Sequence, residues 1–504
     1  MRTRCFLGLD SGGTFIKAAV YDASMKELAV ARRGAAILAP RPGWAERDLE
    51  ELWRDACLVI REAVARAGVA AADIAGVGIS AQGKGLYILD KAGRPLERGV
   101  VSADQRAMKQ VRLWQRNGVP GRLYPLTRQT LWTGHPATLL RWFRDNDPAT
   151  YSRIGKIQMA HDLLRYRMTG EVACELTNIS ESNLYNMNSG RYDEALFDLL
   201  GIPEALSFMP PIVGSTETAG KITAAAAEAT GLAKGTPVAG GLFDVVSTAI
   251  CAGLADGSKL NAVMGTWSIA TGLAEALTDD PEYNYVYGRH PDPGLYIAHD
   301  ASPTSAANLQ WLLDAFPFGQ ETDFSVLNAQ VEALPKATGG VLFLPFITGS
   351  NAGLGMKGGL YGLQAAHGRA HVVQAVMEGI VFSLNVHLRR IRRLFPDATA
   401  LRATGGPARS RPWMRMLADL SGLPVELPTV EETGCTGSAL AAATGAGEFA
   451  SMTEAAGRFS GNGGVVQPDA SARDAYLEKE RRYQRLVAAV RAMEDDSVGE
   501  RKSQ

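Results

Sequence analysis

The segment 6-FLGLDSGGTFIKAAVYD-22 and its counterpart 260-LNAVMGTWSIATGLAE-275 each consist of a β-favouring run, a turn with glycine and threonine, and a second β-favouring run. In such turns, backbone N–H groups converge on one point and, with a threonine hydroxyl, can hold phosphate oxygens. The alternative for either copy alone is a plain β-hairpin, in which glycine only supplies a positive φ. Two copies about half a chain apart predict two similar lobes that bind one polyphosphate, which indicates ATP.

The residues after the first turn distinguish it from commoner nucleotide motifs. A dinucleotide-binding fingerprint needs glycines that open a helix, and a Walker loop ends in Gly-Lys-Ser/Thr. Here the run from Phe15 to Tyr21 is short and β-rich and closes at Asp22, so a returning strand follows the turn. The sequence therefore favours neither a Rossmann site nor a P-loop.

Composition is that of an ordinary soluble enzyme. The chain has 504 residues, of which 46% are hydrophobic and 21% charged, so two or more domains are expected. Lys+Arg (52) and Asp+Glu (53) nearly cancel, which argues against a nucleic-acid or anionic-membrane surface. The first apolar run is too short for a signal peptide, and no apolar stretch reaches membrane-spanning length.

Cysteine and histidine usage gives no metal motif. The 5 cysteines lack CxxC spacing, and the 7 histidines form no HExxH arrangement. This pattern favours reduced thiols over a disulfide framework or a zinc site. A cytoplasmic location is the expectation.

Strands and helices alternate in two rounds along the chain. The first round predicts a helix over about 48–67, a buried strand at 74–80 and a helix over about 103–117; the second, which starts near Gly240, predicts a long helix over about 370–393. This alternation predicts mixed sheets covered by helices, in two related domains with the ligand cleft between them. The expected divisions are an N-terminal domain at 1–248, a C-terminal domain at 249–493 and a disordered tail at 494–504.

Several segments carry a family resemblance. The segments 10-DSGGTFIK-17 and 263-VMGTWS-268 match the two phosphate loops of the FGGY-family carbohydrate kinases. The segments 404-TGGPARSRPWMRMLADLSGLPV-425 and 431-EETGCTGSALAA-442 match the family's adenosine-side motif and the alanine-rich helix after it, and 358-GGLYGLQAAHGRAHVVQAVMEGI-380 matches its C-terminal pattern. The resemblance covers nearly the whole chain. It implies an α/β fold of two related actin-like, ribonuclease-H-like domains, with nucleotide and sugar bound in the cleft between them.

Five further segments resemble the L-xylulose (3-keto-L-gulonate) kinase branch of this family: 42-PGWAERD-48, 80-SAQGKG-85, 124-YPLTRQTLWTGHP-136, 178-NISESNLYNM-187 and 241-GLFDVVSTA-249. The implied activity is ATP-dependent phosphorylation of the terminal primary hydroxyl of a ketopentose or keto-sugar acid. The expected reactions convert L-xylulose to L-xylulose 5-phosphate, or 3-keto-L-gulonate to its 6-phosphate. D-xylulokinase and ribulokinase activities are the alternatives within the family. An actin-like, nucleotide-driven binding ATPase is the non-kinase alternative, because a fold does not fix a function.

The resemblance places Asp244 at the family's catalytic aspartate. It follows a Gly-Gly-Leu-Phe loop and precedes 245-VVSTAICAG-253. Its role would be to accept the proton of the sugar hydroxyl as that oxygen attacks the γ-phosphate. The alternative is that Asp244 only caps the helix that follows, as Asp often does.

The resemblance also assigns the contacts of ATP and Mg²⁺. Asp10, beside the first glycine turn, would hold a hydrated Mg²⁺, which needs few protein ligands. The other expected nucleotide contacts are Gly12, Gly13, Thr14, Lys17, Gly265, Thr266, Ala306, Gln310, Gly405, Gly406 and Ala408. Lys17 faces either phosphate or solvent, and Ala306 and Gln310 fit an ordinary core helix equally well.

Five residues besides Asp244 are expected to contact the sugar. Asp104 and Arg106 match a Trp-x-Asp-x-Arg pattern of the family without its Trp, although the same pair also fits a solvated helix start. Gln82 and Lys84 lie in a loop between two strands, and Asn178 opens one of the branch-specific segments. An ammonium at Lys84 would suit an acidic sugar, and a solvated turn lysine is the alternative. The expected partners are a small-molecule sugar and a second copy of the chain in a homodimer, with no nucleic acid and no membrane.

Overall fold

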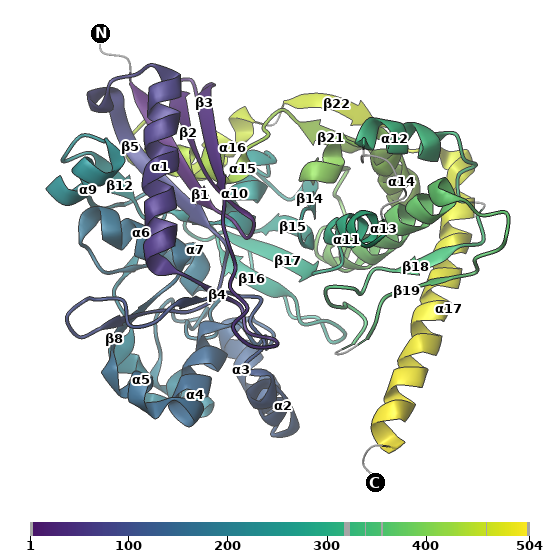
Figure 1. The fold of residues 1–504 in the computed structure, drawn as a ribbon, viewed down its shortest axis with the longest axis horizontal. Helices are drawn as coiled ribbons and strands as arrows, with labels where there is room; N and C mark the ends of the chain where they lie inside the picture. Colours follow the sequence, from purple (N-terminus) through teal and green to yellow (C-terminus); the bar gives the residue numbers. More distant parts are fainter. Residues whose placement is uncertain (1–3, 317–322, 338, 354–355, 460, 501–504) are drawn as a thin grey trace. The chain divides into compact units, whose positions relative to one another are not determined.

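The computed structural model describes residues 4–316, 323–337, 339–353, 356–459 and 461–500 (Figure 1). The chain divides into two compact units, each assembled from separated segments. The first unit comprises Met1–Cys251, Ala274–Ile297 and Glu432–Arg458, and the second comprises Ala252–Leu273, Ala298–Glu431 and Phe459–Gln504. Both units are mixed α/β, as predicted. The expected boundary at 248/249 falls inside helix α10 (Asp244–Cys251).

The first unit is built on a sheet with strand order β11-β12-β5-β1-β2-β3, and β13 also pairs with β5. Strands β1 and β2 are antiparallel, with Asp10 opposite Lys17, which confirms the first predicted hairpin. Strand β1 is parallel to β5. The sheet strands are β1 (Cys5–Ser11), β2 (Phe15–Asp22), β3 (Glu27–Gly34), β5 (Ile74–Ala81), β11 (Thr218–Lys221), β12 (Pro237–Ala239) and β13 (Leu242–Phe243).

Smaller strands and helices complete the first unit. The short strands are β4 (Glu46–Arg47), β6 (Tyr87–Asp90), β7 (Gly99–Val100), β8 (Ile154–Gln158), β9 (Cys174–Glu175), β10 (Ile212–Val213) and β16 (Val286–Arg289). The helices are α1 (Leu49–Ala67), α2 (Met108–Arg116), α3 (Val119–Thr127), α4 (Pro136–Asn146), α5 (Pro148–Arg153), α6 (Ala160–Thr169), α7 (Leu176–Ile179), α8 (Glu194–Leu200), α9 (Ala224–Thr230), α10, α15 (Thr433–Gly445) and α16 (Met452–Arg458).

Helix α1 shows how local sequence sets an element's bounds. The side chain of Asp48 accepts hydrogen bonds from the N–H groups of Glu50 and Glu51, and Gly68 ends the helix in the left-handed region at φ 66°. These are an N-cap and a C-cap of common types. The helix predicted over about 48–67 is therefore confirmed. By contrast, the helix predicted to start near 103 starts at Met108.

Helix α15 packs against strands β1 and β5 through close backbone contacts (Figure 1). A Cβ atom on Gly8 would lie 1.8 Å from the carbonyl oxygen of Cys435, and one on Gly78 would lie 1.8 Å from that of Ser438. Since no side chain fits at such distances, these two strand positions require glycine. The first unit is thus completed by a helix that lies more than 170 residues beyond α10 in the sequence.

The second unit contains β17, β15, β14, β20, β21 and β22 as neighbours in that order. Strands β14 and β15 are antiparallel, which confirms the second predicted hairpin, and β14 is parallel to β20. The elements are β14 (Lys259–Met264), β15 (Ser268–Ala274), β17 (Tyr296–Ser302), α11 (Ala307–Ala315), α12 (Phe324–Glu332), β18 (Leu342–Leu344), β19 (Gly359–Tyr361), α13 (Arg369–Leu394), β20 (Ala400–Thr404), α14 (Arg411–Ser421), β21 (Val425–Pro428), β22 (Asn462–Val466) and α17 (Ala470–Glu500).

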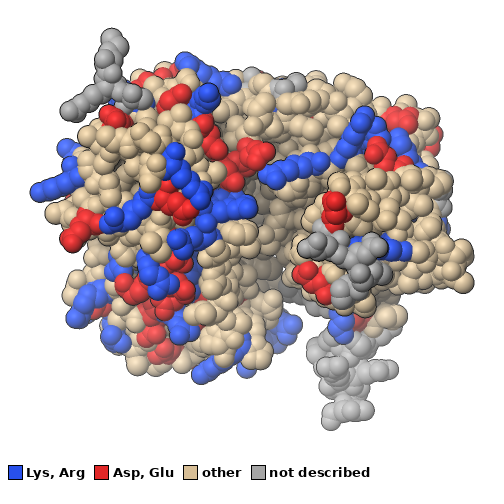
Figure 2. Space-filling model, turned by 45° about the horizontal axis from the view of Figure 1, so that its top comes forward, with Lys and Arg blue, Asp and Glu red and all other residues tan. Residues whose placement is uncertain are grey.

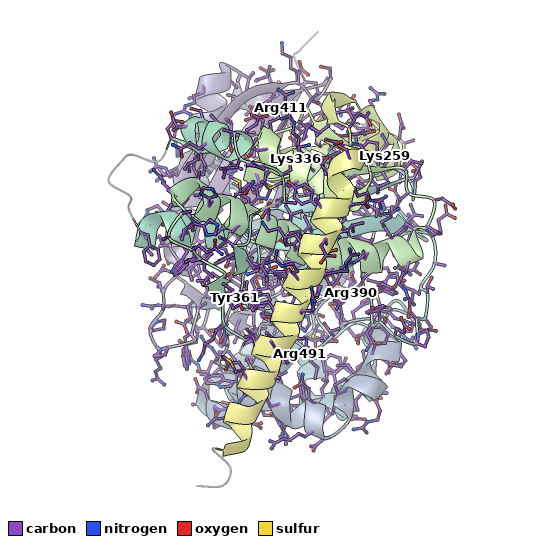
Figure 3. All side chains as sticks on the ribbon, turned by 90° about the vertical axis from the view of Figure 1, so that its right-hand side faces the viewer. Lys259, Lys336, Tyr361, Arg390, Arg411 and Arg491 are labelled. Atoms are coloured by element: carbon purple, nitrogen blue, oxygen red, sulfur yellow. The ribbon has the colours of Figure 1, made fainter. Side chains whose placement is uncertain are left out.

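Charged side chains are mixed rather than segregated. Figure 2 shows Lys and Arg interspersed with Asp and Glu on the visible face. Figure 3 shows α17 crossing the face of the second unit. Lys336, labelled there, reaches Asp419 at 3.1 Å and Asp469 at 3.0 Å. The expected tail begins at 494, but α17 continues to Glu500, and residues 501–504 lie outside the described part of the chain. Among the described helices, none has the length and apolarity to cross a membrane.

Candidate active site

The first glycine turn is closed by a hydrogen bond from the N–H of Gly12 to the carbonyl of Phe15, at 3.0 Å. Gly13 and Thr14 at its tip are exposed, as a ligand contact requires. The ammonium of Lys17 lies 2.6 Å from a carboxylate oxygen of Glu432. Burial disfavours the charged form of Lys17, but the hydrogen bond to Glu432 outweighs burial and raises the pKa of Lys17. Lys17 thus has a protein partner, which the sequence did not indicate.

Asp10 is the second-to-last residue of strand β1, close to this turn, and is half-buried. Its Oδ1 is buried and lacks a hydrogen-bond partner among the described residues. Burial raises its pKa to about 6, although the nearby Lys17 opposes that shift. A carboxylate oxygen left without a donor suits a hard cation, so this site fits the hydrated Mg²⁺ expected of it. Within the described residues, no group of three or more His, Cys, Asp or Glu side chains forms a larger metal site.

Asp244 is the first residue of helix α10 and is half-buried. Burial raises its pKa to about 8, and the nearby Asp10 adds to that shift, while the N–H of Val245 and Lys84 oppose it. A carboxylate with a pKa near neutral and an accessible edge can accept a proton under ordinary conditions. The geometry therefore suits a general base, and it also places Asp244 at the helix start that the capping alternative requires.

Lys84 is held by two contacts within the first unit. Its backbone N–H donates to Oδ1 of Asn178 at 2.8 Å, and its ammonium lies 3.1 Å from Oε2 of Glu181, which is fully buried. The same ammonium lies 5.7 Å from the ring centre of Phe243, the residue before Asp244. Lys84 is therefore not a solvated turn lysine. Glu181 lies inside the segment 178-NISESNLYNM-187, but no local pattern marked it as a partner.

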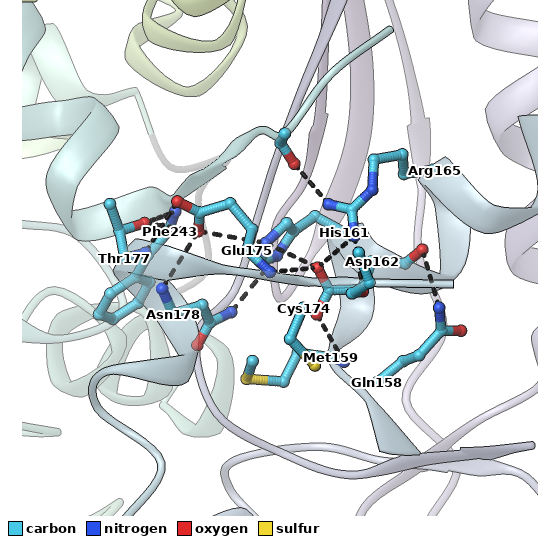
Figure 4. Close-up of polar contacts among 12 residues, drawn as sticks. Gln158, Met159, His161, Asp162, Arg165, Cys174, Glu175, Thr177, Asn178 and Phe243 are labelled. Atoms are coloured by element: carbon cyan, nitrogen blue, oxygen red, sulfur yellow. Dashed lines mark hydrogen bonds and ion pairs between the residues drawn. The ribbon is translucent and has the colours of Figure 1, made fainter. Parts of the chain in front are cut away.

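A buried carboxylate, Glu175, organises the backbone that leads to Asp244 (Figure 4). It accepts hydrogen bonds from the N–H and hydroxyl of Thr177, both at 2.7 Å, and from the hydroxyl of Ser215 at 2.6 Å. The Thr177 hydroxyl in turn accepts the N–H of Phe243 at 2.9 Å. Burial opposes ionisation of Glu175, but its hydrogen bonds outweigh burial and hold its pKa below the ordinary value.

The same network orients Asn178. The Nδ2 atom of Asn178 lies 3.3 Å from Nδ1 of His161, and Nε2 of His161 lies 3.4 Å from Oε2 of Glu175 (Figure 4). Because the other end of the Asn178 amide accepts the N–H of Lys84, this side chain bridges the Lys84 loop and the buried network. The sequence predicted Asn178 as a sugar contact, and the structure gives both ends of its amide protein partners.

Asp104 and Arg106 are also committed to protein partners. Asp104 accepts the N–H of Ala45 at 2.7 Å and the backbone N–H of Arg106 at 2.8 Å. The Arg106 guanidinium contacts Asp104 at 2.9 Å and Glu46 at 2.7 Å, and it lies 3.8 Å from the ring centre of Trp44. The pair is buried rather than a solvated helix start. The hydrogen bonds that Arg106 donates to Asp104 fix the residues before Met108 in a turn, so α2 starts only at Met108.

Gln82 lies at the other end of the Lys84 loop and is buried. Its N–H donates to the carbonyl of Ser11 at 3.1 Å, so this loop is joined to the first glycine turn. Its Nε2 has no hydrogen-bond partner among the described residues. Of the predicted sugar contacts, Gln82 is thus one that keeps a donor available.

In the second unit, the predicted nucleotide residues meet at one end of the sheet. Ala306 donates its N–H to the carbonyl of Gly265 at 3.2 Å, and the parallel pairing of β14 with β20 brings Gly405 to the same end. Gly405 has φ 95°, and a Cβ there would lie 2.3 Å from the carbonyl oxygen of Met264, so only glycine fits. Thr266 is exposed at the tip of the β14–β15 turn.

The remaining predicted residues of this set lie beside that turn. Ala408 donates its N–H to the carbonyl of Gly405 at 3.1 Å, in a short 3-10 helix that includes Gly406. Gln310 is exposed on α11, and its Nε2 bonds Asp314 at 2.7 Å. The alternative role of Gln310, as part of an ordinary core helix, does not fit, because its side chain is exposed.

The raised pKa of Asp244 gives an expected pH dependence of stability. The folded-state pKa of about 8 exceeds the ordinary value of 3.8. Stability from the protonated carboxyl is therefore fully present below about pH 4 and is lost as the pH rises through about 8. Asn cannot ionise, so Asp244→Asn should stabilise the fold increasingly toward alkaline pH. Thermal unfolding of wild type and Asp244→Asn between about pH 4 and pH 8 checks this expectation. A Tm difference between the two proteins that stays constant with pH would contradict it.

Comparison with known proteins identifies the family. The model of the FGGY family of carbohydrate kinases, N-terminal domain, matches residues 5–251, and the C-terminal domain model matches residues 260–446. The chain is 52% identical to the L-xylulose/3-keto-L-gulonate kinase of Escherichia coli (strain K12), over 97% of each chain. It is 49% identical to the probable L-xylulose kinase of Pasteurella multocida (strain Pm70), over 97% of this chain and 99% of that one. The crystal structure of xylulose kinase from Rhodospirillum rubrum superposes with a TM-score of 0.85 at 25% identity, covering 97% of this chain and 99% of that chain. The family resemblance and the fold class are thereby confirmed.

Proposed function

Because the chain belongs to the FGGY family of carbohydrate kinases, we propose that it transfers the γ-phosphoryl group of ATP to the terminal primary hydroxyl of L-xylulose or of 3-keto-L-gulonate. The products are L-xylulose 5-phosphate or 3-keto-L-gulonate 6-phosphate. The observation that carries this proposal is the 52% identity, over 97% of the chain, to a kinase named for both substrates. We also propose a cytoplasmic homodimer; light scattering of the purified protein tests the assembly.

In the proposed mechanism, Asp244 accepts the proton of the sugar hydroxyl as that oxygen attacks the γ-phosphorus. The bond from the γ-phosphorus to the β–γ bridging oxygen breaks, and ADP leaves with that oxygen. The pKa of Asp244, raised to about 8, makes its carboxylate a stronger base than that of an exposed aspartate. The helix that begins at Asp244 would also direct the positive end of its dipole toward the transferred phosphoryl group.

The two glycine turns supply the phosphate contacts of this mechanism. Exposed Gly13 and Thr14 in the first unit and exposed Thr266 in the second offer N–H and hydroxyl donors. Asp10 would hold Mg²⁺ through its water shell, and that ion neutralises charge on the phosphates when bound. Gly405, Gly406 and Ala408 present little side-chain bulk, which suits an adjacent nucleoside.

A coupled ADP-release assay tests the proposal against its alternatives. L-xylulose, 3-keto-L-gulonate, D-xylulose, L-ribulose and glycerol are compared at matched concentrations with MgATP. We expect the highest kcat/KM with L-xylulose or 3-keto-L-gulonate. A clear preference for D-xylulose or L-ribulose would instead support the xylulokinase or ribulokinase alternative. ADP release that does not depend on any sugar would support a nucleotide-driven binding ATPase.

A further inference from the structure

Arg47 contacts the first glycine turn from the protein interior. It ends strand β4 and directly precedes Asp48, the N-cap of α1, so its backbone is fixed on both sides. Its side chain donates to Oγ of Ser11 at 3.1 Å and to the carbonyls of Gly12 and Gly13 at 3.0 and 3.3 Å. Only 2% of the residue is exposed. One guanidinium thus holds three consecutive residues of the turn.

These bonds determine which way the turn's N–H groups face. The peptide bonds of the turn are trans, so each carbonyl points opposite to the N–H of the next residue. With the carbonyls of Gly12 and Gly13 drawn inward to Arg47, the N–H groups of Gly13 and Thr14 are directed outward. Both of those residues are exposed. The turn therefore presents two donors to solvent, on the side where an anion would bind.

The charge of Arg47 is not balanced by a neighbouring carboxylate. No Asp or Glu among the described residues lies within 4.0 Å of its guanidinium, and its Nε has no hydrogen-bond partner among them. A buried cation that contacts only neutral acceptors is costly, and a nearby anion lowers that cost. The adjacent Glu46 does not provide this anion for Arg47, because its carboxylate contacts Arg106 at 2.7 Å. The structure thus leaves the compensating negative charge to come from a ligand at the turn.

We propose that Arg47 is a positioning residue for ATP: it orients the N–H groups of Gly13 and Thr14 toward the phosphates and places a buried positive charge behind them. This inference rests on the proposed function, in which the turn binds ATP. Arg47 does not touch the nucleotide itself. Its effect should therefore appear in nucleotide affinity and in the KM for ATP, and not in sugar affinity.

Titration calorimetry with MgADP and, separately, with L-xylulose tests the inference on wild type, Arg47→Gln, Arg47→Lys and the control Arg54→Gln. Arg54 lies on α1 with 63% of its side chain exposed and pairs with Glu51. Arg47→Gln removes charge-assisted bonds and should weaken MgADP binding about tenfold, or about 1.4 kcal/mol. L-xylulose affinity and kcat at saturating ATP should change less than about twofold. Arg54→Gln should match wild type.

The conservative variant separates geometry from charge. Arg47→Lys keeps the charge but not the planar fork, so it should lose about threefold in MgADP affinity, and it carries the test if Arg47→Gln does not fold. Unchanged MgADP affinity in a folded Arg47→Gln or Arg47→Lys would overturn the inference, as would equal losses for MgADP and L-xylulose. Wild-type protein that binds no MgADP would overturn the kinase proposal as well.

Discussion

The variant Asp244→Asn is expected to show a kcat lower than wild type by roughly two to four orders of magnitude, the range typical of losing a general base. Asparagine keeps the size of the side chain but cannot take the hydroxyl proton. MgATP binding should change little, because the phosphates are assigned to the glycine turns. Steady-state rates with the best sugar from the ADP-release screen, together with MgADP titration, provide the measurement.

A matched control separates catalysis from helix capping. Asp193 caps α8 in the same unit by accepting the N–H of Ala195. Asp193→Asn makes the same chemical change at a helix start, so it should leave kcat unaltered. If Asp244→Asn also keeps a near-wild-type rate, Asp244 serves only to begin α10, and another group must act as the base.

The second large effect is expected at Lys84. If its ammonium binds the carboxylate of 3-keto-L-gulonate, Lys84→Met removes a charge-assisted hydrogen bond worth about 1.5–3 kcal/mol. The kcat/KM for that substrate should then fall by roughly one to two orders of magnitude. Uncharged L-xylulose should lose much less. The ratio of the two kcat/KM values, measured on the same preparations, reports this selectivity directly.

Glu181 makes a second variant necessary. Lys84→Met deprives a fully buried carboxylate of an ion-pair partner 3.1 Å away, which can damage the loop without any substrate contact. The double variant Lys84→Met/Glu181→Gln removes that penalty. A loss confined to 3-keto-L-gulonate should persist in the double variant. Recovery of both sugars there, or equal losses on both in the single variant, would show that Lys84 supports the loop rather than the substrate carboxylate.

Elements that depend on local sequence could be predicted closely. The two glycine hairpins, α1 and α13 follow from β-favouring runs around glycine turns, from the Asp48 cap and from a sustained apolar period. The late start of α2 could not be predicted, because it depends on bonds that Asp104 makes to Ala45 and Arg106. Ala45 lies 59 residues away in the sequence, so no window around α2 contains it.

The candidate site shows the same limit. Sequence reasoning selected Lys17 and Lys84 as cations for ligands, but their partners Glu432 and Glu181 lie 415 and 97 residues away. Arg47 lies inside 42-PGWAERD-48, one of the segments that resemble the L-xylulose kinase branch of the family. Nothing in that segment indicates that its arginine reaches a turn more than 30 residues earlier. Paired charges of this kind follow from the fold and not from local pattern.

The return of α15 to the first unit has a consequence for how the protein is made. A ribosome releases Cys251 long before Arg458, and at about 5–20 residues per second the interval is roughly 10–40 s. During that time the nascent chain exposes the glycine-lined faces of β1 and β5 that α15 later covers. An uncovered apolar sheet face makes an incomplete chain prone to aggregation. Productive synthesis should therefore depend on holdase chaperones, and a gene split after Cys251 should yield an insoluble N-terminal half.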